Sequence, residues 1–150
     1  MTELIAAIDD VIKYGLQPNL KTEDRDRQLE KNLVKIYSYY FDIAFQFDDT
    51  DYPDFDRQIG TVRQNVESNF PEFGFYKSVS DINDIDNLQN DHIGDAIDDL
   101  TDIIIELWEI KWRMVNNSIA DGLWFFELIF YSHTQQHILS LLNYMKQRNG

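Results

Sequence analysis

Apolar side chains recur at every third or fourth position through most of this sequence, and no other feature limits its fold as strongly. Near the N-terminus, Leu4, Ile8 and Val11 follow this spacing, which places them on one face of a helix. Strand patterns are weak, because there is no clean alternation and no Asn-Gly or Asp-Gly hairpin turn. We therefore expect an all-α, up-and-down helical bundle of four to five helices, with residues 1–150 as a single helical domain. The predicted helices cover residues 2–14, 23–47, 54–69, 92–116 and 118–147.

Helix boundaries follow from capping and helix-breaking residues. Thr22 is a candidate N-cap of the second helix, and Ser118 of the last one. Residues 48–54 form a turn-rich loop. Residues 70–79 break the helical pattern, but their aromatic residues predict a segment that packs against the bundle. Residues 81–91 form an acidic, polar connector.

The negative charge is concentrated in one part of the chain. The net charge is −14, and residues 42–102 hold sixteen acidic and three basic residues. Such a surface repels phosphate backbones, so we expect no nucleic-acid partner. A basic protein partner or a bound cation is favoured, and the alternative is a solvated surface that maintains solubility. The acidic residues proposed as an interaction surface are Asp48, Asp49, Asp51 and Asp54.

The cellular setting is predicted from the segments that are missing. The chain has no cysteine, which excludes disulfides and thiolate chemistry and fits a reducing compartment. The first residues lack the basic and apolar regions of a signal peptide. No apolar run approaches the ~20 residues of a membrane span. We therefore expect a soluble, cytoplasmic protein without a membrane partner.

Two of the three histidines, His133 and His137, lie four residues apart and share one helix face. Neutral imidazoles at this spacing can hold one divalent ion if other side chains complete the site. Asp99 and Asp102 are the best candidates, because they belong to an acidic stripe along the helix predicted over 92–116. If that stripe faces water, the histidines instead hydrogen-bond to carboxylates or backbone within the core. Both interpretations remain open, because the sequence does not show which face of this helix is buried.

Other motifs for catalysis or cofactor binding are missing. There is no Gly-rich phosphate loop, no nucleophile elbow, and no Glu-x-x-His pair of a dinuclear metal site. Residues 81–92 resemble a calcium loop only superficially, because the required glycine and glutamate are missing. We therefore expect no cofactor other than a divalent metal.

Three segments, FPEFGFYKSV, GDAIDDLTDI and LWFFELIFYSHTQQH, follow one another along the chain. They resemble successive blocks of the bacterial domain-of-unknown-function family 5063. The resemblance covers about residues 70–145, and departs where Thr134 replaces a tryptophan and Gln136 replaces an arginine. It implies an all-helical bacterial protein of uncharacterised function, with the acidic helix and the histidine pair in one motif set. The matching residues are Phe73, Gly74, Tyr76, Gly94, Asp95, Asp98, Asp99, Leu100, Asp102, Trp124, His133 and His137.

The leading hypothesis is a non-enzymatic, acidic protein-interaction or regulatory module, for example one that neutralises a basic toxin. The motivation is a charge block without a catalytic constellation. The second hypothesis is a metal-binding helical bundle, for example a hydrolase, that uses the His-x-x-x-His pair and the facing aspartates. A structural oligomer is the third, and the sequence leaves the oligomeric state open.

Overall fold

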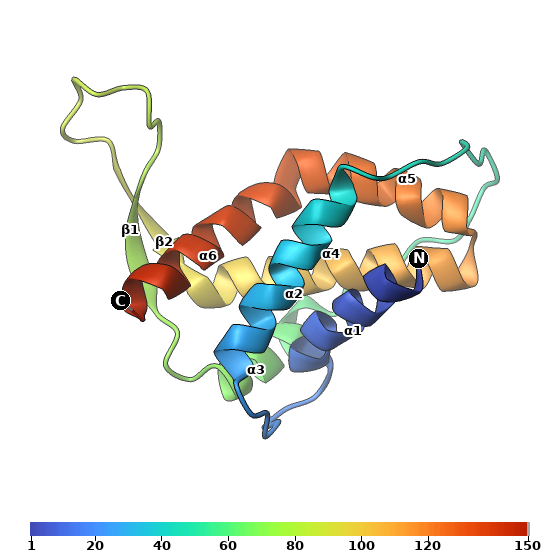
Figure 1. The fold of residues 1–150 in the computed structure, drawn as a ribbon, viewed down its shortest axis with the longest axis horizontal. Coiled ribbons are helices and arrows are strands. Elements are labelled where there is room, and N and C mark those ends of the chain that lie inside the picture. The colour runs from blue at the N-terminus through green and yellow to red at the C-terminus, as the bar shows by residue number, and fades with distance from the viewer. Residues whose placement is uncertain (150) are drawn as a thin grey trace.

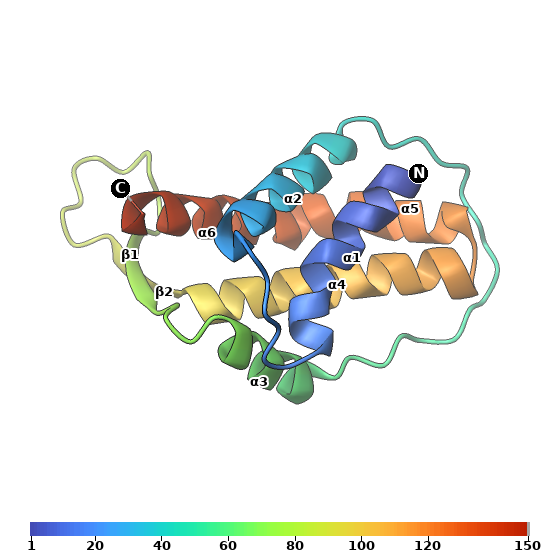
Figure 2. The ribbon, with the colours of Figure 1, turned by 60° about the horizontal axis from the view of Figure 1, so that its bottom comes forward.

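The computed structural model describes residues 1–149, which are mostly helical and carry one small antiparallel sheet (Figures 1 and 2). The expected all-helical class is correct for the bulk of the chain and wrong in detail, because two strands are present. The elements are α1 (Thr2–Leu16), α2 (Arg25–Tyr40), α3 (Ile59–Asn69), β1 (Phe75–Val79), β2 (Asp91–Asp95), α4 (Ala96–Asn116), α5 (Ile119–Ile129), the π-helical turn η1 (Phe130–Thr134) and α6 (Gln135–Arg148).

Helix α4 is the centre of the structure. It contacts α1, α3, α5 and α6, and it is buried on most of its circumference. Figure 2 shows it running through the middle of the molecule, with α1 crossing it and α3 beside it. The buried side chains of all helices join into one hydrophobic cluster, and Leu100, Ile104 and Leu107 are completely buried in it. Burial of this kind stabilises the fold by roughly 1.5–3 kcal/mol for each large aliphatic side chain.

The segment between α2 and α3 corrects two predicted helix boundaries. Residues 41 and 42 form a turn and residues 43–58 have no regular secondary structure, although apolar residues continue at helical spacing. Their aromatic rings pack against rings of α4 and α5. The ring centroids of Phe55 and Trp108 are 5.0 Å apart, and those of Phe47 and Trp124 are 6.4 Å apart. These long-range aromatic contacts outweigh local helix propensity, which is a weak preference. Figure 1 shows this segment passing around the end of the bundle.

The two strands form a hairpin that the sequence analysis did not predict. β1 pairs with β2 in antiparallel register, with Phe75 opposite Asp95 and Val79 opposite Asp91. The strands are joined by residues 80–90, which are too long a loop for a two-residue turn signal to mark. The start of the predicted helix 92–116 therefore belongs to a strand, and α4 begins only at Ala96. Asp95 caps it by accepting a hydrogen bond from the Ile97 backbone N–H at 3.0 Å.

The last predicted helix is continuous but contains a π-helical turn. The Gln135 backbone N–H donates to the Phe130 carbonyl five residues earlier, in place of the usual spacing of four. The Ser118 cap is confirmed, because its hydroxyl accepts a hydrogen bond from the Asp121 N–H at 3.0 Å. The Thr22 cap is wrong, since α2 begins at Arg25 after Asp24, which makes no capping hydrogen bond. Among residues 1–149, no helix is both long and apolar enough to cross a bilayer.

Candidate metal centre

The acidic stripe of α4 faces into the protein. Of its five acids, three are withdrawn from water: Asp99 is 6% exposed, and Glu106 and Glu109 are each 4% exposed. The other two, Asp95 and Asp102, are partly exposed. Buried carboxylates are costly unless cations or hydrogen-bond donors compensate them. The stripe therefore needs partners along its whole length.

The two ends of the stripe have arginine partners. Near the start of α4, Asp95 pairs with Arg63 at 3.0 Å. Near its end, Glu109 pairs with Arg57 at 2.8 Å and with Arg113 at 2.9 Å.

The middle of the stripe is compensated differently. Asp99, Asp102 and Glu106 form no ion pair with lysine or arginine within residues 1–149. Their ionic partners are the two histidines of the last helix. Three carboxylates facing two imidazoles leave an excess of negative charge at this point of the structure.

Each histidine is held by a carboxylate at Nδ1. The Nδ1 of His137 lies 2.7 Å from Asp99 Oδ1, and the Nδ1 of His133 hydrogen-bonds to Glu106 Oε1. Because an ionised carboxylate only accepts hydrogen bonds, each Nδ1 must carry the proton. In the neutral ring Nε2 is then an unprotonated lone pair, which is the tautomer of a metal-binding histidine.

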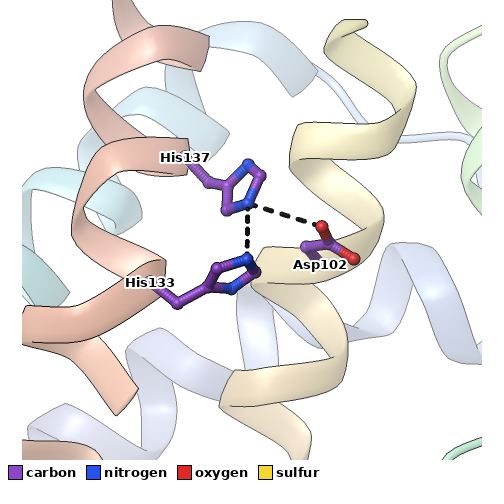
Figure 3. A group of neighbouring side chains, drawn as sticks. All are labelled: Asp102, His133 and His137. Carbon is purple, nitrogen blue, oxygen red and sulfur yellow. Dashed lines mark hydrogen bonds and ion pairs between the residues drawn. The ribbon is translucent and has the colours of Figure 1, made fainter. Parts of the chain in front are cut away.

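The two Nε2 atoms converge on one point (Figure 3). They lie 3.2 Å apart, and Asp102 Oδ2 lies 3.4 Å from the Nε2 of His137. The three ligand atoms of His133, His137 and Asp102 lie within 4.8 Å of one another. Two neutral rings would repel in this arrangement, since two lone pairs would face each other. A proton on one ring or a cation between the rings removes that repulsion.

The π-helical turn η1 contains His133 and Thr134. Phe130, Thr134 and Ile138 are all completely buried, so the helix keeps one line of residues against the core through η1. The hydroxyl of Thr134 donates to Glu106 Oε2, which fixes the carboxylate that holds His133. Single π-turns within α-helices occur often at functional sites.

A second group of residues fixes Asp99. The hydroxyl of Tyr76 donates to Asp99 Oδ2 while the other oxygen meets His137, so both oxygens of Asp99 are engaged. Tyr76 lies across Gly94 on the partner strand, where a Cβ atom would come within 2.1 Å of the ring. Burial first, then the hydrogen bond to Asp99, raises the pKa of Tyr76 and keeps its hydroxyl a donor.

The electrostatics of the site follow from this arrangement. Burial alone lowers the pKa of His137, but the hydrogen bond that its Nδ1–H donates to Asp99 and the charges of Asp99, Asp102 and Glu106 outweigh burial and raise that pKa. Burial raises the pKa of Asp102, and the charges of Asp98 and Asp99 add to this effect, while the two histidines oppose it. Both shifts have the direction expected where negative charge is in excess.

A cleft of about 890 Å³ opens beside His137, between the hairpin and the helices α4 and α6. Tyr76, His92, Asp98 and Ser140 contribute to its walls. The side chain of His133 is 48% exposed, so the point between the histidines is accessible from solvent.

The structure thus brings three of the four sequence-derived candidates, His133, His137 and Asp102, to one point. The fourth, Asp99, lies on the far side of the His137 ring. The sequence analysis did not select Glu106 for the site, although it belongs to the same stripe. Thr134 and Tyr76 carried no sequence signal for this role.

The proposed acidic interaction surface is divided in the structure. Asp49, Asp51 and Asp54 are exposed on the segment 41–58. Asp48 is only half exposed, and it accepts hydrogen bonds from Ser118 Oγ at 2.6 Å and from the Thr50 N–H at 3.1 Å. Asp48 therefore fastens the segment to the start of α5.

Comparison of the chain with models of protein families, with curated proteins and with solved structures finds no match. The resemblance to family 5063 stays a prediction, and the function is argued from the site alone.

Proposed function

We propose that the protein binds one divalent transition-metal ion through the Nε2 atoms of His133 and His137 and a carboxylate oxygen of Asp102. The observation that carries this proposal is the orientation of the two rings. Both Nδ1 atoms meet buried carboxylates, and both Nε2 atoms point at one location 3.2 Å apart. Metal-bound histidines in proteins almost always have such a carboxylate or carbonyl partner on the second nitrogen.

The spacing of the ligand atoms suits a single ion. Metal–nitrogen bonds of about 2.0–2.1 Å at tetrahedral angles separate two ligand atoms by about 3.3–3.4 Å. The observed separations are 3.2 Å between the imidazoles and 3.4 Å from His137 to Asp102. The third distance, between the ligand atoms of His133 and Asp102, is at most 4.8 Å. Rotation of the Asp102 side chain toward His133 would shorten it.

Charge balance supports the same proposal. Asp99, Asp102 and Glu106 bring three negative charges, and the neutral histidines bring none. A divalent cation offsets two of these charges in a partly buried site, where electrostatic interactions are stronger than in water.

The ligand set indicates the kind of ion and chemistry. Two imidazoles and one carboxylate suit zinc, iron, manganese, cobalt or nickel rather than calcium or magnesium. Three protein ligands with solvent access leave a coordination position for water, as in catalytic zinc sites. An ion held by His133, His137 and Asp102 would supply Lewis-acid activation of a water for attack on a substrate. Hydrolysis of a substrate held in the adjoining cleft is the reaction class that this arrangement favours.

Calorimetric titration of chelator-treated protein with Zn²⁺ tests the binding. We expect one ion for each chain, and a loss of affinity greater than about 100-fold in His133→Ala and in His137→Ala, more than outer partners usually contribute. His92→Ala is the matched control, because His92 is exposed on β2 outside the ligand cluster. Absence of Zn²⁺ binding by the unchanged protein would instead favour histidines that act only as hydrogen-bond partners.

A second candidate function is the acidic interaction module. Its support is the exposed segment 41–58, where Asp49, Asp51 and Asp54 alternate with aromatic residues, and Phe47 is 66% exposed. A basic protein partner would be attracted by these carboxylates and would bury the exposed ring. Replacing the three aspartates with asparagine should slow association with such a partner at low salt. An unchanged association rate would contradict this candidate.

A further inference from the structure

The tip of the hairpin exposes apolar side chains to an unusual degree. In the loop 80–90, Ile82 and Ile85 are each 81% exposed and Leu88 is 89% exposed. Single exposed apolar residues are common, but three at intervals of three residues on one short loop indicate a contact site. Figure 1 shows the tip projecting away from the helices, and nothing within residues 1–149 covers its apolar side chains.

The tip is also acidic. Asp81, Asp84 and Asp86 lie between its apolar residues and are exposed. None of them forms an ion pair within residues 1–149, whereas many other acids of the chain do. The partner of this loop should therefore offer an apolar surface bordered by cations.

The same chain carries such a surface elsewhere. A groove of about 520 Å³ lies between α2 and α6, with Val34 and Leu142 as its apolar floor. Arg27, Lys31 and Lys35 follow one another at intervals of four on α2, and Lys146 adds a cation from α6. Glu30 is the one acid in the lining.

The groove is available for contact with another molecule. Val34 is 55% exposed. Within residues 1–149 the four cations of the groove form no ion pair. In a chain with a net charge of −14, this is a concentration of positive charge opposite in sign to the tip.

We propose that the hairpin tip of one copy of this protein docks into the α2–α6 groove of a second copy. Ile82, Ile85 and Leu88 cover the apolar floor, and the aspartates of the tip meet the lysines of α2. In both ribbon views the tip points away from helix α2, so the contact joins two molecules (Figures 1 and 2).

The contact joins different surfaces of the two copies, so it closes into a reciprocal pair or a larger ring where the geometry allows, and otherwise extends into open chains. Its small area places it among weak, transient interfaces. Exposed ion pairs contribute more at low ionic strength, where the Debye length exceeds about 10 Å.

Sedimentation velocity of the full chain, in chelator and at low salt, tests this contact. Chelator removes any association through metal ions, so the result does not depend on the metal centre. We expect the average mass to rise above the 17.8 kDa of one chain as the concentration increases. Lys31→Glu with Lys35→Glu makes the groove acidic, and Asp84→Lys with Asp86→Lys makes the tip basic.

Each double variant alone should remain monomeric, because its tip and groove carry like charges. An equal mixture should associate again, because the tip of each variant is complementary to the groove of the other. Asp49→Lys with Asp51→Lys is the control, since it reverses the same amount of charge on segment 41–58 and should leave association intact.

The apolar part has its own test. Ile85→Ser with Leu88→Ser changes no charge and should abolish association while the melting temperature stays unchanged. A protein that remains monomeric at every concentration, a mixture that fails to associate, or a control that loses association would each overturn the proposal. If the tip binds only a different, basic protein, this protein will remain monomeric at every concentration.

Discussion

His133 and His137 face each other through Nε2 at 3.2 Å, while Glu106 and Asp99 hold their Nδ1 atoms from behind. This arrangement selects one tautomer of each ring and directs two lone pairs at the same point. A protein that needed the histidines only as hydrogen-bond donors would not need to bring these lone pairs together.

Asp102→Asn should change stability and metal binding in opposite directions. Burial raises the pKa of Asp102, so its ionised form destabilises the metal-free fold at neutral and alkaline pH. At pH 8, the metal-free variant should therefore melt at a higher temperature than the unchanged protein. Its stabilisation by Zn²⁺ should be lost. Thermal scans with and without Zn²⁺ measure both effects, and a lower melting temperature in the metal-free variant would be inconsistent with this account.

Glu106→Gln and Asp99→Asn should weaken metal binding without removing a ligand. Each replacement removes the negative charge beside the Nδ1 proton of one histidine and leaves one acceptor oxygen where the carboxylate used two. Such changes in outer partners typically reduce affinity by about 10–100-fold. Asp98→Asn is the matched control, because Asp98 lies on the same helix, is exposed and pairs with Arg63 at 3.3 Å. Competition with a zinc indicator gives the three affinities. Equal losses in all three variants would point to a general charge effect.

Gly94→Ala should disturb the site from a distance. The new Cβ would lie within 2.5 Å of ring atoms of Tyr76, so the ring must move away from Asp99. We expect a drop of about 10-fold in Zn²⁺ affinity, the low end for a change in outer partners. The pKa of Tyr76 should also shift down toward its ordinary value. Gly74→Ala is the control, since its Cβ would meet nothing within 4 Å. An unchanged tyrosine titration in Gly94→Ala would contradict the role of Tyr76.

Asp48→Asn should reveal a pH-dependent contribution to stability. The hydroxyl of Ser118, then that of Tyr52 and the groups of Thr50, hold the pKa of Asp48 well below its usual value of 3.8. A carboxyl with a lowered pKa in the folded state stabilises the fold above its unfolded pKa, and this contribution is lost as the pH falls below it.

The melting temperature of Asp48→Asn should therefore lie below that of the unchanged protein at pH 7, and the difference should shrink by pH 3. Asp49→Asn, at an exposed position next to it, should show no difference at either pH. A difference for Asp48→Asn that grows on acidification would have the wrong sign.

The helical part of the fold could be predicted because its signal is local. Leu29, Leu33 and Ile36 recur at helical spacing and are completely or almost completely buried, as expected. The segment 41–58 has the same kind of spacing in Ile43 and Phe47. Its conformation depends on rings of α4 and α5 that lie far away in sequence, and no local pattern records such contacts. The hairpin was missed because its strands are five residues each and its loop has no short turn signal.

The candidate site was only partly predictable for the same reason. The spacing of His133 and His137 placed them on one face, and the stripe of α4 supplied Asp102. Which carboxylate lies in front of a ring and which lies behind it depends on the relative rotation of two helices, which the sequence does not contain. Thr134 joins the site through the π-helical turn, and the sequence gives no signal for that turn.

Crystals of the protein grown with Zn²⁺, measured at the zinc absorption edge, test the central claim most directly. We predict one strong anomalous peak between the helices, about 2.0–2.2 Å from Nε2 of His133, Nε2 of His137 and an oxygen of Asp102. A zinc peak only at His92 or at the exposed aspartates of 41–58, with none between the two imidazoles, would contradict it.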